Sequence, residues 1–446
     1  MVNMKISSSV VLPNQKMKEV FYIQDNLTNK ISYYHMLAFL VMLPFDPVYS
    51  ELVLISLLIH TFIHITKEKI LSIKLPLLLP ALLYLLTLAG TIYTNDKEQA
   101  FKDLEKQLAI LLFPFIFSAS SLDLKSYKLR LLKAFGITCV IAILYLYIDA
   151  LHVMRYNKLS LPALFSSAFT NHNFSAPIEL HATYFSMYIA LSISTFLYLL
   201  IISSKITARI FYAACLVILF AGLIQLSSRA VFIAVLIVIN IILPLFLLKK
   251  NTRKKFIFIS SLFFMLTIIS LATIDSFKKR YIVELKNDLT RNAVSYDLPE
   301  PRMARWYYIW DMIKKSPIIG YGSGSEGNLL KEKYYEHQLY LSYLKELNAH
   351  NQYLSFLLKS GIIGLGLYIC ILAFGFINAI QTKDFFFCSF LIIVAVVSFS
   401  ENILDVNKGI FFFSFFFSFF TSPATSFQIL VPTKWLVKKA GSIRSI

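Results

Sequence analysis

The sequence has few charged residues, and this scarcity excludes an ordinary soluble domain. Only 15% of the 446 residues are Asp, Glu, Lys or Arg, whereas 57% are hydrophobic and the mean hydropathy is +0.66. Soluble domains have about 25% charged and about 45–50% apolar residues. Apolar runs of roughly 18 residues or more recur along the chain, and each can cross about 30 Å of hydrocarbon as a helix. The sequence therefore predicts an all-α, polytopic integral membrane protein.

Cysteine and signal-peptide features are also scarce. The four cysteines, Cys139, Cys215, Cys370 and Cys388, lie inside apolar runs without metal-binding or pairing spacing, so we interpret them as small buried apolar residues. The first thirty residues have no apolar core of the signal-peptide type, and we expect no cleaved leader. The net charge of +18 does not indicate a nucleic-acid partner, because Lys and Arg gather in short loops between apolar runs.

The apolar runs predict about twelve membrane spans. We place them at about 34–49, 51–66, 75–93, 108–122, 132–152, 182–202, 208–226, 230–248, 256–274, 361–380, 384–400 and 408–424. With these spans, the basic clusters at 67–74, 125–133, 205–209, 249–255 and 434–444 all fall on one side of the membrane. Cytoplasmic loops carry the excess of Lys and Arg, so both termini are expected in the cytoplasm.

One hydrophilic insertion, at about 275–350, stands out and is expected on the outer face. In ARWYYIWDMIKKSP, Trp306, Ile309, Trp310 and Ile313 share one helical face. That face either lies at the membrane–water interface or packs on the protein's own spans. Lys359 is expected at the interface. The chain then divides into a cytoplasmic segment 1–33, spans 1–9 within 34–274, a periplasmic loop 275–350 with amphipathic helices, spans 10–12 within 351–424, and a basic cytoplasmic tail 425–446.

This topology brings scattered polar residues to one end of the spans. Arg229 begins a span, Arg302 lies in the long loop, His350 ends that loop, and Glu401 follows the eleventh span. Ionisable groups at membrane depth are costly unless they are paired or solvated, so each is a site candidate. Each also has a plainer interpretation: Arg229 can reach the interface by snorkelling, Arg302 can be a solvated loop residue, His350 with Asn351 can cap a helix, and Glu401 can simply orient an arginine.

Several sequence elements resemble a known family. The segment HNQYLSFLLKSGIIG, from His350 to Gly364, is similar to the H-N-x-x-L…G-x-x-G signature of the O-antigen ligase and O-antigen polymerase superfamily. RMARW followed by PIIGYG resembles its R-x-x-x-W…P-x-x-G-x-G element, and SSRAVFIAV resembles its S-R motif. ELHATYFSMYI is similar to a His–Tyr element of some members. The main elements occur in family order, between about 180 and 400.

The resemblance implies a GT-C-like membrane glycosyltransferase that uses no metal or other cofactor. Such an enzyme sits in the cell inner membrane and takes a glycan from undecaprenyl diphosphate at the periplasmic face. In this interpretation Arg229 and Arg302 bind the diphosphate, and His350 is the essential loop histidine. Further substrate contacts are expected from Arg305, Trp306, Asn351, His181, Tyr184 and Glu401. The expected partners are the lipid-linked glycan donor, lipid A core or another glycan acceptor, and membrane lipids.

These roles agree with the chemistry of the residue types. Arginine can bind phosphate oxygens through two parallel hydrogen bonds and stays protonated, so two arginines can neutralise a leaving diphosphate as a divalent metal would. Histidine is a suitable general base for an attacking sugar hydroxyl. No DxD-like carboxylate pair stands out in the segments expected on the outer face.

Three activities within this family and one from another class stay open. Ligases pass the glycan to lipid A core, polymerases pass it to another lipid-linked repeat, and protein O-oligosaccharyltransferases pass it to a hydroxyl side chain. The shared motifs do not separate these, because acceptor choice depends on pocket shape. A secondary transporter also has about twelve spans, but its ionisable residues and helix breaks gather near the midplane of the bilayer. We expect O-antigen ligation.

Overall fold

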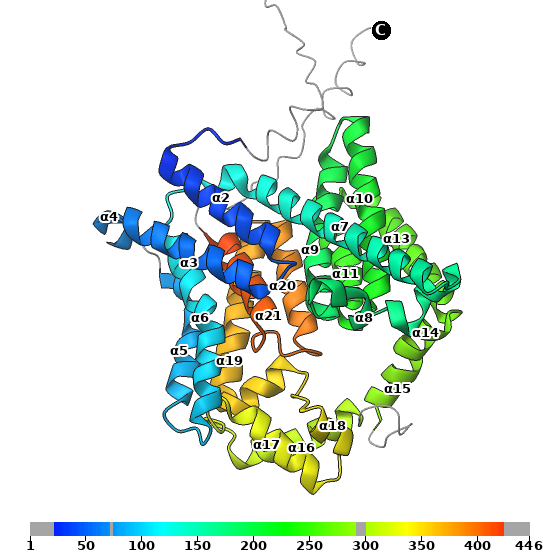
Figure 1. Cartoon of the computed structure of the whole chain (residues 1–446). Helices are drawn as coiled ribbons and strands as arrows, with labels where there is room; N and C mark the ends of the chain where they lie inside the picture. The colour runs from blue at the N-terminus through cyan, green and yellow to red at the C-terminus, as the bar shows by residue number, and fades with distance from the viewer. Residues whose placement is uncertain (1–21, 72–74, 291–299, 423–446) are drawn as a thin grey trace, which may run out of the picture.

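The computed structural model describes residues 22–71, 75–290 and 300–422, and within these ranges the chain is helical with no strand (Figure 1). The expected tail at 425–446 and most of the N-terminal segment lie outside the described residues. The helices up to residue 226 are α2 Leu27–Met42, α3 Pro47–His64, α4 Lys67–Leu71, α5 Ala81–Gly90, α6 Lys97–Ala119, α7 Leu124–Tyr156, α8 His172–Ser175, α9 Ala182–Ile202 and α10 Ile206–Leu226.

The second half begins with a helix that contains a π-helical turn. It runs through α11 Arg229–Ile237, the turn Val238–Ile242 and α12 Leu243–Leu247. The remaining helices are α13 Lys250–Ala272, α14 Asp275–Lys278, α15 Glu284–Asp288, α16 Arg302–Lys315, α17 Ser325–Glu336, α18 Tyr340–Leu344, α19 Gln352–Gln381, α20 Phe385–Val397 and α21 Asn407–Thr421. A second π-helical turn, Lys279–Val283, joins α14 to α15.

Seven of the described helices are long and apolar enough to cross a membrane, which agrees with a polytopic membrane protein. They are α3, α7, α9, α10, the α11–α12 helix, α13 and α19. Each of the twelve expected spans overlaps a different helix, but α2, α5, α20 and α21 are shorter than 18 residues, and α6, although it has 23 residues, is not among the seven because its first half is rich in charged residues. The count of twelve, and the assignment of 275–350 as a periplasmic loop, therefore stay predictions.

Helix α21 forms the centre of the bundle. Its phenylalanines from Phe411 to Phe420 are at most 3% exposed, and it packs against α6, α9, α19 and α20. A helix that is apolar on every side is typically buried. Stacked and edge-to-face ring pairs, such as Phe39–Phe415 at 5.0 Å and Phe113–Phe415 at 5.4 Å between centroids, hold it in place.

The helices α16, α17 and α18 gather at one end of the bundle (Figure 1) and form a second, smaller core with the start of α19. Ile309 and Ile313 of α16 are 0% and 4% exposed in this core, and Trp306 packs beside them, whereas Trp310 is 49% exposed. Most of the predicted aromatic and aliphatic face therefore packs on the protein itself rather than on a membrane surface.

Two of the glycine-containing sequence elements pack against each other backbone to backbone. Gly361 has φ +59° and interrupts the helical geometry of α19. The carbonyl groups of Leu358 and Lys359, freed by this break, accept the N–H groups of Tyr321 and Gly322 at 2.9 and 2.8 Å. A Cβ at Gly361 would lie 2.1 Å from the carbonyl oxygen of residue 318, so only glycine fits. The α16–α17 connection is thereby anchored on α19.

Candidate active site

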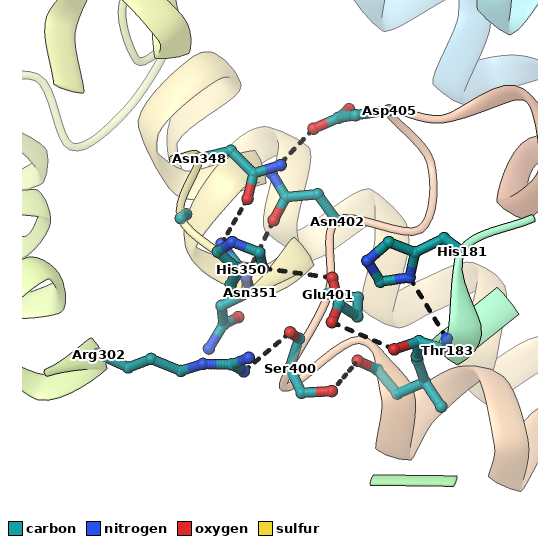
Figure 2. A network of polar contacts seen from close by, with 12 residues as sticks. His181, Thr183, Arg302, Asn348, His350, Asn351, Ser400, Glu401, Asn402 and Asp405 are labelled. Carbon is teal, nitrogen blue, oxygen red and sulfur yellow. Dashed lines mark hydrogen bonds and ion pairs between the residues drawn. The ribbon is translucent and has the colours of Figure 1, made fainter. Parts of the chain in front are cut away.

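His350 lies in the short connection between α18 and α19, held in an unusual backbone conformation. Its φ is +45°, a left-handed value that is rare for residues other than glycine and costs about 1–3 kcal/mol. Asn348 Oδ1 accepts the His350 N–H at 2.9 Å, and Asn402 Oδ1 accepts the Asn351 N–H at 2.9 Å (Figure 2). The side chain of Asn351 caps α19 by accepting the N–H groups of Tyr353 and Leu354. The capping interpretation therefore holds for Asn351, while the His350 side chain is left for another contact.

That contact is a hydrogen bond to Glu401, in the connection between α20 and α21. His350 Nδ1 lies 3.2 Å from Glu401 Oε2, and the Thr183 hydroxyl donates to Glu401 Oε1 at 3.4 Å (Figure 2). The glutamate side chain is 12% exposed. Burial raises the pKa of Glu401, but the hydrogen bond and charge of His350, with the charges of His181 and Arg302, outweigh burial and lower this pKa to about 2. Glu401 is therefore ionised, and its direct partner is the histidine rather than an arginine.

This hydrogen bond determines which histidine nitrogen is free. If Nδ1 carries the proton and donates it to Glu401, Nε2 keeps its lone pair and can accept a proton from a ligand. The side chain of His350 is 23% exposed, so part of this side chain is accessible from outside the protein. A histidine oriented by a carboxylate in this way is the arrangement found at general-base sites.

The start of α9 covers the opposite side of Glu401. His181 is the N-cap of this helix, where its Nδ1 accepts the Thr183 N–H at 3.3 Å. Desolvation lowers the pKa of His181. The charge of Glu401 raises this pKa, and the charges of His350 and Arg280 lower it further, so the pKa is lowered overall. The Tyr184 hydroxyl donates to the Asn402 carbonyl at 3.4 Å, so Tyr184 helps to hold the Glu401 connection.

Arg229 and Arg302 converge on a single carboxylate. Asp288 Oδ2 lies 2.5 Å from Arg229 Nη2 and 3.7 Å from Arg302 Nε. The two side chains are only 15% and 19% exposed, which excludes the interpretation of Arg302 as a solvated loop residue and of Arg229 as a side chain reaching outward to water. Arg229 Nη1 is buried with no hydrogen-bond partner among the described residues. A buried donor without a partner costs about 1–3 kcal/mol, more when it is charged, and leaves capacity for a further anion.

Arg302 connects this arginine pair to the histidine. Its Nη1 donates to the Ser400 carbonyl at 2.9 Å, immediately before Glu401 (Figure 2). Burial lowers the pKa of Arg302 against the opposing charges of Glu401 and Asp288, but an arginine keeps its proton at any physiological pH. Arg280 adds a third positive charge that interacts with both arginines, and its own side chain pairs with Glu284 at 2.5 Å.

Arg305 and Trp306 hold the connection that carries His350. Arg305 Nη1 donates to the Asn348 carbonyl at 3.3 Å, and Trp306 Nε1 donates to the Ala349 carbonyl at 2.8 Å. Arg305 is 3% exposed. These contacts show that both side chains hold the loop in position. The expected contact of Arg305 and Trp306 with substrate stays a prediction.

The polar residues behind the loop form a second network that the sequence analysis missed. Glu326 of α17 accepts the Ala349 N–H and the Asn402 side-chain amide, both at 2.9 Å. Lys359, which we had expected at the membrane interface, is instead buried and bonded to Asp405 at 2.7 Å. The expectation was wrong because α19 begins at Gln352, ahead of the break at Gly361. The first turns of α19 belong to the second, smaller core formed with α16, α17 and α18.

The structure thus brings Arg229, Arg302, His350, Asn351 and Glu401 into one continuous network with His181 and Tyr184. Sequence reasoning missed Arg280, Asp288 and Thr183, and also His172, whose ring centroid lies 4.1 Å from that of His181. Thr183 lies inside the ELHATYFSMYI element but was not selected there. No motif marks Arg280, Asp288 or His172, and only the packing of α8 and α14–α15 around the site identifies them. Among the described residues, no group of three or more His, Cys, Asp or Glu could hold a metal ion.

Comparison with known proteins identifies one family. Residues 214–369 match the family model described as O-antigen ligase. This segment contains Arg229, Arg302 and His350, while Glu401 and His181 lie outside it. No curated protein matches the chain.

Proposed function

Because the chain belongs to the O-antigen ligase superfamily, we propose that it moves a glycan from undecaprenyl diphosphate to an acceptor hydroxyl at the periplasmic face of the inner membrane. The particular reaction proposed is ligation of O-antigen to lipid A core. The family supports an O-antigen ligase or polymerase type of activity and glycan and lipid substrates in general. The proposed transfer from a lipid diphosphate rests on the arrangement of arginines, histidine and glutamate in the network around His350, whereas the choice of lipid A core as acceptor follows only the description of the matching family.

The arginine pair suits the leaving group. Arg229 and Arg302 already hold the Asp288 carboxylate, so their guanidinium groups are spaced to share one anion. In the proposed complex a diphosphate oxygen accepts a hydrogen bond from Arg229 Nη1, which has no partner among the described residues. The diphosphate also replaces Asp288 as the anion that Arg302 binds. As the bond between the sugar C1 and the phosphate oxygen breaks, its electron pair passes to that oxygen. The arginines stabilise the developing charge with no need for a metal ion.

His350 suits the acceptor. Its Nε2 takes the proton of the attacking hydroxyl while that oxygen forms the new bond to the sugar C1. The ionised Glu401 stabilises the imidazolium that results and keeps the ring in the correct tautomer. The proton then leaves to solvent through the exposed part of the side chain.

The observation that carries the proposal is the continuous chain of contacts from Asp288 through Arg302 and Ser400 to Glu401 and His350. It links a buried arginine pair to an oriented histidine. The test is His350→Ala in purified protein. Transfer in a single turnover should fall by about 10²–10⁴, the usual contribution of a general base, while binding of a labelled polyprenyl-diphosphate donor should persist.

His152→Ala is the matched control, because this exposed histidine on α7 lies outside the network and its loss should leave transfer unchanged. Supplying lipid A core in one reaction and a second lipid-linked repeat in another separates ligation from polymerisation. Loss of donor binding in His350→Ala, with transfer per bound donor intact, would contradict the role given to His350.

A further inference from the structure

A polar cavity is lined in part by Asn348 of the His350 loop and by Asp405 of the connection between α20 and α21. Its volume is about 390 Å³, within the range of roughly 300–1,000 Å³ that small-molecule sites occupy. It opens between the first turns of α6 and the helix α17. Asn328 of α17 bonds to Asp96, ahead of α6, at 2.5 Å, and the Lys331–Glu346 ion pair lies beside the cavity at 2.6 Å.

The lining of this cavity excludes most classes of ligand. Each of its thirteen residues is charged, carries an amide or is glycine, so the cavity does not suit a lipid chain. Five carboxylates outnumber three lysines, which disfavours a phosphate or another anion. No three metal-ligating residues of the described chain are arranged to hold a cation. Carboxylates and amide oxygens accept hydrogen bonds, while lysines and amide nitrogens donate them.

The same lining residues hold the candidate active site. Asn348 lines the cavity, and its side chain accepts the His350 N–H at 2.9 Å. Asp405 lines it too and accepts from Asn402 at 3.0 Å, while Asn402 in turn accepts the Asn351 N–H. One layer of side chains therefore separates the cavity from His350. A ligand here would lie one layer of side chains away from His350.

We propose that this cavity, beside Gly327 of α17 and Asp103 of α6, is a saccharide subsite that binds a neutral or amino-bearing, hydroxyl-rich sugar unit. Sugar hydroxyls both donate and accept hydrogen bonds, which a lining of mixed carboxylates, amides and lysines satisfies. The sugar belongs either to the acceptor or to the donor glycan, and this part of the proposal rests on the proposed function. The cavity selects the sugar, while the arginines hold the diphosphate.

Gly327 offers a steric test, because it lines the cavity and a Cβ there would meet no atom within 4 Å. Gly327→Trp should fill the cavity without a clash against the backbone, and Gly327→Ala should leave it open. Gly366→Trp is the matched control, since Gly366 of α19 also faces open space and does not line the cavity. The first measurement is binding of free core oligosaccharide to each purified protein by saturation-transfer NMR. If the cavity holds the acceptor sugar, wild type, Gly327→Ala and Gly366→Trp should bind the oligosaccharide, and Gly327→Trp should not; if it holds the donor sugar, the loss appears in the donor KM instead.

The second measurement identifies the source of the sugar from the KM of each substrate. In Gly327→Trp the KM of the substrate whose sugar occupies the cavity should rise about tenfold or more, the loss of about 1.4 kcal/mol or more of binding. A rise for the acceptor alone assigns the cavity to the acceptor, and a rise for the donor alone assigns it to the donor glycan. Asp103→Asn, which keeps the shape and removes a charge, should produce a smaller change in the same substrate.

The outcomes separate this inference from the proposed function. Absence of transfer in wild type would overturn the proposed function, while the binding measurement would still test the cavity. Failure of wild type to bind the oligosaccharide, together with unaltered KM values in Gly327→Trp, would overturn the saccharide subsite and leave the arginine and histidine roles intact. Equal oligosaccharide binding by Gly327→Trp and wild type, together with unaltered KM values for both the donor and the acceptor, would overturn it as well.

Discussion

Replacing Glu401 by glutamine tests how the site orients its histidine. The present contact joins His350 Nδ1 to a carboxylate at 3.2 Å, with the carboxylate held by the Thr183 hydroxyl. A glutamine amide can donate a hydrogen bond to Nδ1, which would move the ring proton to Nε2 and remove the base. In serine proteases the corresponding carboxylate-to-amide change lowers kcat by about 10⁴. Since 3.2 Å is at the long end for hydrogen bonds, we expect a fall of about 10²–10⁴ in single-turnover transfer.

The assay for Glu401→Gln separates orientation from general damage. Donor binding should stay near the wild-type level, because the arginines that face Asp288 are unchanged. Glu401→Asp, which keeps the charge on a shorter side chain, should recover part of the rate. Unaltered transfer in Glu401→Gln, with protein present at normal levels in the membrane, would refute the role of this carboxylate. Equal loss in Glu401→Asp and Glu401→Gln would point to a structural role instead.

The same substitution has a consequence for stability in acid. The pKa of Glu401 is lowered from 4.5 to about 2 in the folded protein, because the effect of His350 and the neighbouring cations exceeds that of burial. Between these values the unfolded chain takes up a proton that the native protein does not bind, so stability falls as pH drops from 4.5 toward 2. Glu401→Gln should lose this pH dependence. Thermal unfolding in detergent on both sides of pH 4.5 measures it, and identical pH profiles for the two proteins would contradict the assigned pKa.

Three further predictions concern the donor site and the topology. Arg229→Lys and Arg302→Lys keep the charge but lose the paired hydrogen bonds, so donor binding should weaken and transfer should fall by about 10²–10³; wild-type kinetics in both would contradict diphosphate binding by arginine. Purified protein in excess chelator should keep its transfer activity, and loss that magnesium or manganese restores would show an unrecognised metal site. Reporter fusions near Lys254 should indicate cytoplasm and those near Asp288 periplasm, and the reverse at either position would remove the proposed periplasmic site.

The sequence predicted the helical class and the main polar residues of the site. Long apolar runs have few structural alternatives in a membrane, because only helices and closed barrels satisfy every backbone polar group there. Arg229, Arg302 and His350 could be selected because charge at membrane depth is costly and because their surrounding motifs resemble a family. Helix ends were less certain: α19 begins at Gln352, where Asn351 caps it, nine residues before the expected span.

Only the tertiary structure decided which groups act on one another. Local sequence says nothing about Asp288 lying between two arginines from distant segments, or about Glu401 pairing with His350 across 51 positions of the chain. Hydropathy sums over a window and is insensitive to such contacts, whereas pairing depends on distances of a few ångströms set by helix packing. Because a membrane protein needs long apolar helices, the helices could be predicted from composition alone. The three-dimensional fold determined the partner of each buried charge.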